Sequence, residues 1–207
     1  MRKAVQRYGQ QRGKRMALRA QANEQDMTLN MFDFLVYGEW EAKDEEAHER
    51  VVLETEPNFH VKVTKCPWNN AWKEGGLSSF GRFYCLEVDH ALINGFNPKL
   101  KLAVNATLPN DQKDCDFVFY DAQLSPENMG LLEMCRAEVH DKAVMPWYYH
   151  LGHLYKTVGE VVVEELGQNG LKAVKAAMNE FAGQFGEEAS GIVDGFGEVD
   201  FDRLPED

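Results

Sequence analysis

The sequence lacks the features by which several common classes of protein are recognised. None of its four cysteines forms a Cys-x-x-Cys pair, which excludes a zinc ribbon and a thioredoxin-type redox motif. No apolar run approaches the ~20 residues that a membrane-spanning helix needs, and no apolar stretch follows the basic amino terminus as it would in a signal peptide. We therefore expect a cytoplasmic protein without membrane contact, whose cysteines are free thiols.

Positive charge is also scarce, because 22 Lys and Arg stand against 34 Asp and Glu and give a formal net charge of -12. Proteins bind nucleic acid through clustered cations, so no nucleic-acid partner is expected. The exception is the segment 1–23, which holds seven basic residues and no acid. We interpret it as a helix whose basic face docks on acidic surface of the same fold. An organelle transit peptide is the alternative interpretation.

The pattern of apolar residues predicts one α+β domain with a small antiparallel sheet flanked by helices from both ends of the chain. We expect this domain to span residues 1–185, with the sheet at about 50–120 and helices within 1–40 and 125–185. Phe59, Val61 and Val63 alternate with polar positions, as in a strand with one buried face. The strand that begins at Cys115 is apolar on both faces, which favours a central strand covered on both sides. The acidic segment 186–207 is expected to be a flexible tail.

Four short motifs follow one another between residues 59 and 120. They are Cys66-Pro67 after a strand, Cys85-x-x-x-Asp89 in a helix, Asn97-Pro98 in a turn, and Cys115-Asp116-Phe117 at the start of a strand. Together with the block Tyr8-Gly9-x-x-Arg12-Gly13, they resemble the L-2-amino-thiazoline-4-carboxylic acid hydrolase family over about residues 1–120. The turn before Cys115 departs from the family pattern, because it reads Asn110-Asp111 where a glycine is expected.

The resemblance implies a hydrolase that opens a small cyclic amidine or amide ring, such as a 2-aminothiazoline carboxylate. Ring opening needs a nucleophile at the amidine-like carbon, a proton for the leaving ring atom and a cation for the carboxylate. The nucleophile can be water or a thiolate, and a thiolate requires a lowered thiol pKa. A carboxylate at the ring nitrogen would act as acid or base.

The candidate catalytic residues are Cys66, Cys85, Asp89, Cys115 and Asp116. Cys85 and Asp89 are four residues apart in a helix and therefore share one face. Cys66 precedes a helix start whose backbone amides can stabilise a thiolate. Because Cys115 and Asp116 are neighbours in a strand, they point to opposite faces and only one of them can line a given pocket. The ordinary alternative for each cysteine is a buried apolar thiol.

The candidate substrate-binding residues are His60, His90, Arg12 and Arg15. An arginine binds a carboxylate through two parallel hydrogen bonds, and both arginines lie in the family-like amino-terminal block. His60 lies on the polar row that leads to Cys66, and His90 directly follows Asp89. Solvated surface positions are the alternative for the arginines.

We expect no metal and no cofactor. The competing interpretations are a zinc ion held by the three thiols with Asp89, and a metal held by His140, His150, His153 and Glu160. The rival function is a non-catalytic ligand-binding or sensor domain with a Cys-lined pocket. The expected partner is a small molecule. A second subunit of a homo-oligomer, or a carboxyl-terminal helix, is expected to replace the amino-terminal helix of the family that this chain lacks.

Overall fold

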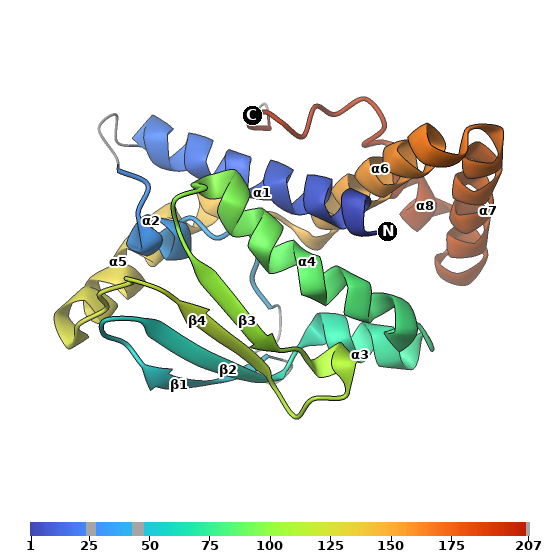
Figure 1. Cartoon of the computed structure of the whole chain (residues 1–207). Helices are drawn as coiled ribbons and strands as arrows, with labels where there is room; N and C mark the ends of the chain where they lie inside the picture. The colour runs from blue at the N-terminus through green and yellow to red at the C-terminus, as the bar shows by residue number, and fades with distance from the viewer. Residues whose placement is uncertain (24–27, 43–47, 206–207) are drawn as a thin grey trace.

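The computed structural model describes residues 1–23, 28–42 and 48–205, and it confirms the α+β class. The elements in the first half are α1 (Arg2–Asn23), α2 (Met31–Val36), β1 (Glu49–Glu54), β2 (Phe59–Lys65), α3 (Pro67–Glu74), α4 (Ser78–Phe96), β3 (Leu102–Ala106), η2 (Leu108–Asn110) and β4 (Cys115–Phe119). The second half is helical, with α5 (Pro126–Ala143), α6 (Trp147–Leu166), α7 (Gln168–Phe185) and α8 (Glu187–Asp194). Figure 1 shows helices from both halves gathered on one side of the sheet.

The four strands pair antiparallel in the order β1-β2-β4-β3, so β4 is a central strand as the sequence predicts. Phe59, Val61 and Val63 of β2 lie opposite Phe119, Phe117 and Cys115 of β4. These side chains form the covered face and pack toward the helices in the main core. Because side chains alternate along a strand, the remaining ones point the other way.

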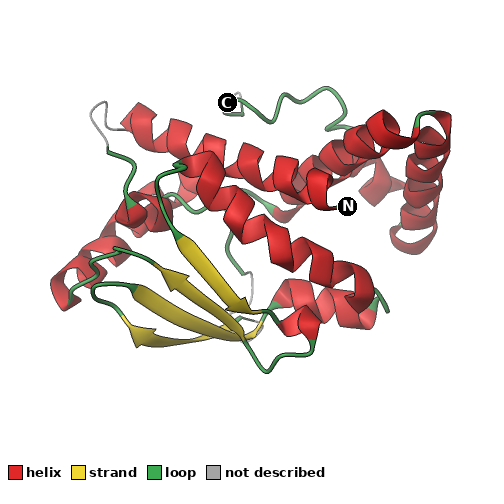
Figure 2. Ribbon diagram, in the orientation of Figure 1, coloured by secondary structure: helices red, strands yellow, loops and turns green. Residues whose placement is uncertain are grey.

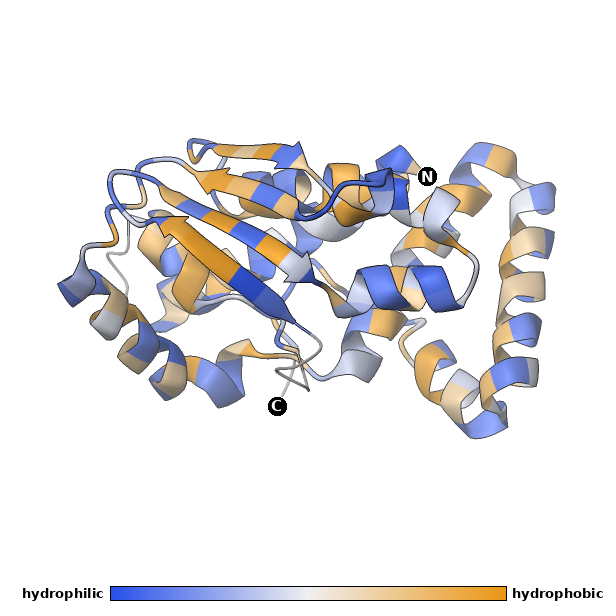
Figure 3. Ribbon diagram, turned by 90° about the horizontal axis from the view of Figure 1, so that it is seen from below, coloured by the Kyte–Doolittle hydropathy of each residue, from blue (hydrophilic) through white to orange (hydrophobic). Residues whose placement is uncertain are grey.

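The expectation that β4 is covered on both sides is wrong. Figure 2 shows the strands in yellow below the helices, and Figure 3 shows the other face of the sheet from below, in front of the helical layer. Asp116 lies on this open face beside Lys62, its partner in the β2–β4 register. Polar side chains from both strands bond one another there, so the face needs no apolar cover.

Helices α1 and α4 lie in close contact at glycines, as the spacing of Gly9 and Gly13 suggests. A Cβ atom added to Gly13 would come within 2.0 Å of the Leu92 carbonyl oxygen, and one added to Gly95 within 2.2 Å of the Gln10 carbonyl oxygen. Glycine weakens a helix by about 1 kcal/mol relative to alanine. Here the absence of side chains at these glycines permits the two backbones to touch, which brings α1 side chains next to those of α4.

The basic face of α1 docks on acidic surface of the same fold, as predicted. Arg7 forms a two-pronged contact with Glu164 of α6, with N–O distances of 2.8 and 2.7 Å. Arg2 pairs with Glu87 of α4, and Lys14 pairs with Asp202 near the carboxyl end. The segment 1–23 is therefore an integral helix of the fold, and its charge is matched by the acidic remainder of the chain.

The carboxyl-terminal segment differs from the flexible tail expected for 186–207, of which positions 206 and 207 lie outside the described residues. Residues Glu187–Asp194 form α8, and Phe201 is 1% exposed. Phe201 stacks on His153 of α6 with ring centroids 4.1 Å apart, and its carbonyl oxygen accepts a hydrogen bond from Arg15. One buried aromatic ring thus fixes a segment whose acidic composition predicts disorder.

The predicted turn before β4 forms without glycine. Asp111 adopts the left-handed conformation, with φ 60°, directly after η2. Aspartate tolerates this region better than most residues.

None of the helices in the described ranges has both the length and the apolar character that a bilayer crossing requires.

Candidate functional site

Three cysteines and one carboxylate gather where the end of β2, the start of β4 and the helices α3 and α4 meet. We call Cys66, Cys85, Asp89 and Cys115 the thiol–carboxylate cluster. Cys66 and Cys115 belong to one apolar cluster with Val63. Cys85 lies within electrostatic range of Asp89 and of both other thiols, and Asp89 acts on Cys66 and Cys115 as well. Each of these four candidate residues thus lies within electrostatic range of the other three.

Local structure positions each member of the cluster. Cys66 is the N-cap residue of α3 without a side-chain capping hydrogen bond, and the nearby backbone N–H groups of Asn69 and Trp68 act to lower the pKa of its thiol. Cys115 accepts a hydrogen bond from the Leu108 backbone N–H at 3.3 Å. Cys85 and Asp89 are one turn apart on α4, so they share a face. Cys66, Cys85 and Asp89 each keep part of their surface exposed, whereas Cys115 is 6% exposed.

Burial dominates the acidity of the cluster. It raises the pKa of Asp89 from 3.8 to about 6, although the positive charge of Arg12 acts in the opposite direction. Burial also raises the pKa of Cys115 to about 11 despite its hydrogen bond from Leu108. The Asp89 carboxyl therefore titrates near neutral pH, which is the range that suits a general acid or base.

The expectation that the α3 amino terminus yields a low-pKa thiolate is wrong for this arrangement. Burial raises the pKa of Cys66 more than the amides of Asn69 and Trp68 lower it. Burial, with the charge of Asp89 next, raises the pKa of Cys85 far above its usual value. The cluster thus holds protonated thiols beside a carboxyl that can take up a proton.

Arg12 of α1 links the cluster to a second charged centre. Burial opposes its charge, but the neighbouring Tyr8, Tyr84, Glu39 and Asp89 together raise its pKa. Its guanidinium lies 5.5 Å from the centre of the Tyr8 ring, and its Nε lies 3.6 Å from Glu39 Oε2. The Nε atom has no hydrogen-bond partner among the described residues. Arg12 is therefore a buried cation with unused donor capacity near Asp89.

Arg15 differs from Arg12, although both are candidate carboxylate-binding residues in sequence. Its Nε and Nη2 donate to the two Glu39 carboxylate oxygens at 2.9 and 2.8 Å, and its Nη1 donates to the Phe201 carbonyl. The side chain is fully buried. Because these bonds occupy the guanidinium donors of Arg15 inside the protein, the structure favours Arg12 over Arg15 as the residue that binds a substrate carboxylate.

The other candidates lie outside the cluster. Asp116 and His60 meet on the open face of the sheet, with His60 Nε2 3.0 Å from Asp116 Oδ1. Asn105 donates to the same oxygen at 2.9 Å. His90 is exposed on α4, one residue after Asp89. The structure thus brings together four of the five predicted catalytic residues and places Asp116 across the sheet from Cys115.

Neither metal interpretation matches the side-chain positions. Within the described ranges, no group of three or more His, Cys, Asp or Glu side chains lies close enough to hold a metal ion. His153 instead contacts Arg15 at 3.3 Å and Gln11 at 2.9 Å. His140 contacts Glu41 and Asp141.

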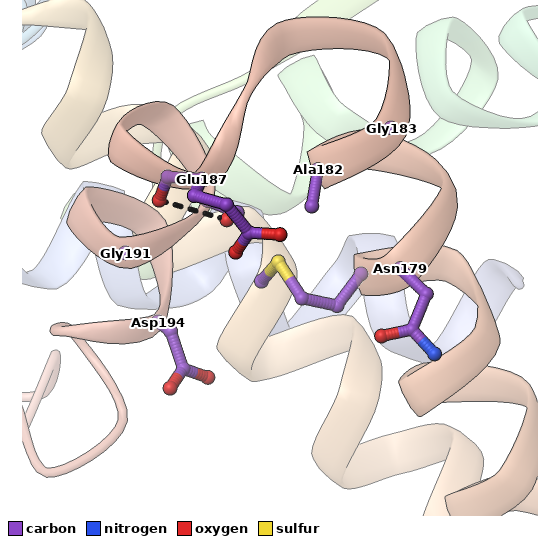
Figure 4. A pocket seen from close by; sticks show the side chains of 8 residues that line it. Asn179, Ala182, Gly183, Glu187, Gly191 and Asp194 are labelled. Carbon is purple, nitrogen blue, oxygen red and sulfur yellow. Dashed lines mark hydrogen bonds between the residues drawn. The ribbon is translucent and has the colours of Figure 1, made fainter.

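Two surface hollows lie elsewhere. One, of about 570 Å³, lies between α7 and α8, where Glu187 and Asp194 line it (Figure 4). The other, of about 420 Å³, lies beside α2 and includes Met31. Neither hollow is lined by a residue of the thiol–carboxylate cluster.

Several residues near the cluster are not among the catalytic or substrate-binding candidates that the sequence indicates. Tyr8 and Tyr84 lie within electrostatic range of Arg12, and Trp68 stacks on Tyr84 with centroids 5.1 Å apart. Tyr8 opens the family-like block, so its position was a usable signal. His150 lies within electrostatic range of Arg12, although the two are more than 130 residues apart in the chain. Nothing in the sequence pairs them.

Comparison with known proteins agrees with the motifs. The model of one protein family, L-2-amino-thiazoline-4-carboxylic acid hydrolase, matches residues 1–119. No curated protein and no solved structure matches the chain. The matched part contains all four residues of the thiol–carboxylate cluster together with Arg12, and it covers more than half of the sequence. The chain therefore belongs to the L-2-amino-thiazoline-4-carboxylic acid hydrolase family.

Proposed function

We propose that the protein hydrolyses a small cyclic amidine that carries a carboxylate, such as a 2-aminothiazoline carboxylate, at the thiol–carboxylate cluster. The observation that carries this proposal is the Asp89 carboxyl, which is partly exposed beside three thiols and has a pKa of about 6. A carboxyl with this pKa is ionised in most molecules at pH 7, yet it remains basic enough to accept a proton. Membership of the hydrolase family supports the choice of substrate.

In the reaction, the Asp89 carboxylate takes a proton from a water molecule as the water oxygen bonds to the amidine-like carbon. The resulting tetrahedral centre breaks its bond to a ring atom, and the protonated Asp89 returns the proton to that leaving atom. The proton of the new hydroxyl group passes to the ring nitrogen as a carbonyl group forms. One water is consumed, one ring bond is broken, and Asp89 ends ionised as it began. Arg12, a buried guanidinium with unused donors, holds the substrate carboxylate.

A thiol can replace water in the same scheme. Cys85, one turn from Asp89 on α4, would then give its proton to Asp89 while its sulfur attacks the amidine-like carbon. After the ring has opened, a water molecule would attack the same carbon, break its bond to the Cys85 sulfur and return a proton to that sulfur. Because burial raises the thiol pKa values, attack by a preformed thiolate fits less well than proton transfer during attack. In both routes Asp89 handles the proton, so its role does not depend on the nucleophile.

A second candidate function is a ligand-binding domain without catalysis. The protonated, half-buried thiols favour it, because inert buried cysteines serve as apolar lining. The two functions differ in the fate of the ligand, since a binding domain returns the ring intact and a hydrolase returns it opened with the mass of one water added.

Incubation of the purified protein with 2-aminothiazoline-4-carboxylate, followed by mass spectrometry, tests the proposal. We expect the ring-opened product to accumulate with time and with protein concentration. A parallel sample treated with a metal chelator should give the same rate. Binding of the ring compound without any product would contradict hydrolysis and leave the ligand-binding function.

A further inference from the structure

Three buried polar atoms around Arg12 lack a hydrogen-bond partner among the described residues. They are the Tyr8 hydroxyl, Arg12 Nε and His150 Nδ1. The residues are 0%, 7% and 1% exposed. Buried polar atoms in folded proteins nearly always have a partner, because an unpaired one loses its hydrogen bonds to water without replacement. A group of three around one guanidinium therefore indicates a place that a ligand completes.

The hydrogen bond of His150 fixes which of its nitrogens carries the proton. His150 Nε2 lies 3.1 Å from the Glu39 backbone oxygen, which can only accept, so Nε2 must donate. Burial, with Arg12 next, lowers the pKa of His150 to about 3, and the ring is neutral. Its Nδ1 is then a bare acceptor. Tyr8 and Arg12 offer donors, so the unpaired atoms around Arg12 include both kinds of hydrogen-bonding group.

Two routes place His150 on the same side of the cluster as Arg12. Arg12 acts electrostatically on both His150 and Asp89, so both lie within electrostatic range of its guanidinium. Trp147 lies against His150 with ring centroids 6.4 Å apart, and against Trp68 with centroids 5.5 Å apart. Trp68 is two residues after Cys66. Neighbouring aromatic rings thus extend from His150 through Trp147 to Trp68, which is close in sequence to Cys66.

The charges of this region favour an anion. Arg12, Arg15 and Arg19 are all less than 9% exposed, and the buried carboxylate that contacts them is Glu39. Asp89 adds one negative charge near Arg12, so the three cations still exceed the two anions by one. A ligand that brings a carboxylate would balance the charge and use the free Arg12 donor.

We infer that Tyr8 and His150 complete the binding site for the ring, with Tyr8 and Arg12 donating to the ligand carboxylate and His150 Nδ1 accepting an N–H from the same ligand. The inference rests on the proposed function for the identity of the ligand. His150 is contributed by α6, which lies outside the matched residues 1–119, so the carboxyl-terminal half of the chain supplies part of the specificity.

A pair of ring compounds tests the contact. The 2-amino ring carries an exocyclic N–H donor, and 2-methylthiazoline-4-carboxylate does not. Both are titrated calorimetrically into the Asp89→Asn variant, so that the ring is not consumed. We expect the amino compound to bind about tenfold more tightly than the methyl compound, equivalent to ~1.4 kcal/mol.

Two substitutions separate binding from structural support. The Gln amide of His150→Gln reaches the Nε2 position and keeps the bond to the Glu39 carbonyl, but it removes the acceptor at Nδ1. His150→Asn places an acceptor at the Nδ1 position and loses the Glu39 bond. His153→Gln is the matched control, because His153 is one turn along α6 and both of its nitrogens already have partners. These three substitutions are made in the Asp89→Asn background.

We expect His150→Gln to reduce the preference for the amino compound to about one, and His150→Asn and His153→Gln to keep it within threefold. An unchanged preference in His150→Gln overturns the inference even if wild-type protein hydrolyses the ring. A preference that His150→Gln abolishes, without turnover by wild type, upholds the inference and defeats the proposed hydrolysis. If neither compound binds, both proposals fall.

Discussion

Two carboxylates, Glu39 and Asp89, lie beside the same helix, α1, and their surroundings are opposite. Glu39 is 0% exposed and accepts hydrogen bonds from Arg15 and Arg19. Burial alone would raise its pKa, but Arg15, Arg19 and Arg12 lower it overall. Asp89 has Arg12 nearby without a hydrogen bond from the described residues, and burial raises its pKa to about 6.

The number of donors that reach each carboxylate explains the difference. Glu39 stays ionised because arginine donors hold both of its oxygens, so it can only support the structure. Burial destabilises the ionised form of Asp89, and no hydrogen bond from the described residues holds its carboxylate oxygens. Asp89 can therefore exchange a proton with a ligand. Arg12 lies between the two and takes part in both centres.

The largest effect on stability is expected at Glu39. Glu39→Gln leaves three buried arginines without their anion, and we expect a loss of about 3–5 kcal/mol in the free energy of unfolding. Urea denaturation followed by circular dichroism measures it. Glu164→Gln, which removes the exposed partner of Arg7, is the control and should leave the free energy of unfolding almost unchanged. Equal losses in the two variants would show that the Glu39 centre does not hold the fold.

The next effect concerns pH. Because the folded pKa of Asp89 is raised, the ionised form predominates only above about pH 6. If the carboxylate is the base, kcat/KM should fall about tenfold per pH unit below pH 6 and level off above pH 7. The pH–rate profile measures this. A profile that is flat from pH 5 to 8 would remove Asp89 from proton transfer.

The same pKa makes a prediction about stability. Protonated Asp89 is favoured in the fold, so the free energy of unfolding should fall between pH 4 and pH 7 relative to the Asp89→Asn variant. Denaturation of both proteins at the two pH values measures the difference. A difference that grows in favour of wild type toward pH 7 would mean that Asp89 is stabilised as Glu39 is.

Sequence reasoning located the Asp89 centre but not the Glu39 centre. Cys66, Cys85, Asp89 and Cys115 stand in local motifs, and helix and strand periodicity already indicate where each side chain points. The partners of Glu39 are dispersed from Arg12 in α1 to His150 in α6, and their association depends on how α6 packs against α1. That packing is set by shape over the whole fold, for example by the contact of Tyr8 in α1 with His153 in α6, and no local pattern encodes it.

A smaller effect is expected at the thiols. The charge of Asp89 contributes, after burial, to the raised pKa of Cys85. We expect iodoacetamide to modify Cys85 about two- to threefold faster at pH 8 in Asp89→Asn than in wild type. Peptide mass spectrometry measures the rate, with Cys135 in the same sample as the reference. Slower modification in the variant would contradict the electrostatic link.

The smallest effect is expected at Asp116, on the open face of the sheet. Asp116→Asn should change kcat/KM less than threefold and cost about 1 kcal/mol or less, because its contacts with His60 and Lys62 are partly exposed. Steady-state kinetics and urea denaturation check both values. A hundredfold loss of activity with unchanged stability would place the site on the open face.

The most direct measurement of the central claim compares Asp89→Asn with His90→Ala in the hydrolysis of 2-aminothiazoline-4-carboxylate. The two positions are adjacent on α4, but Asp89 lies in the thiol–carboxylate cluster and His90 is exposed. We predict that Asp89→Asn lowers kcat by about 10²–10⁴-fold and that His90→Ala stays within threefold of wild type. Equal activity in the two variants would contradict the assignment of Asp89 as the group that moves the proton.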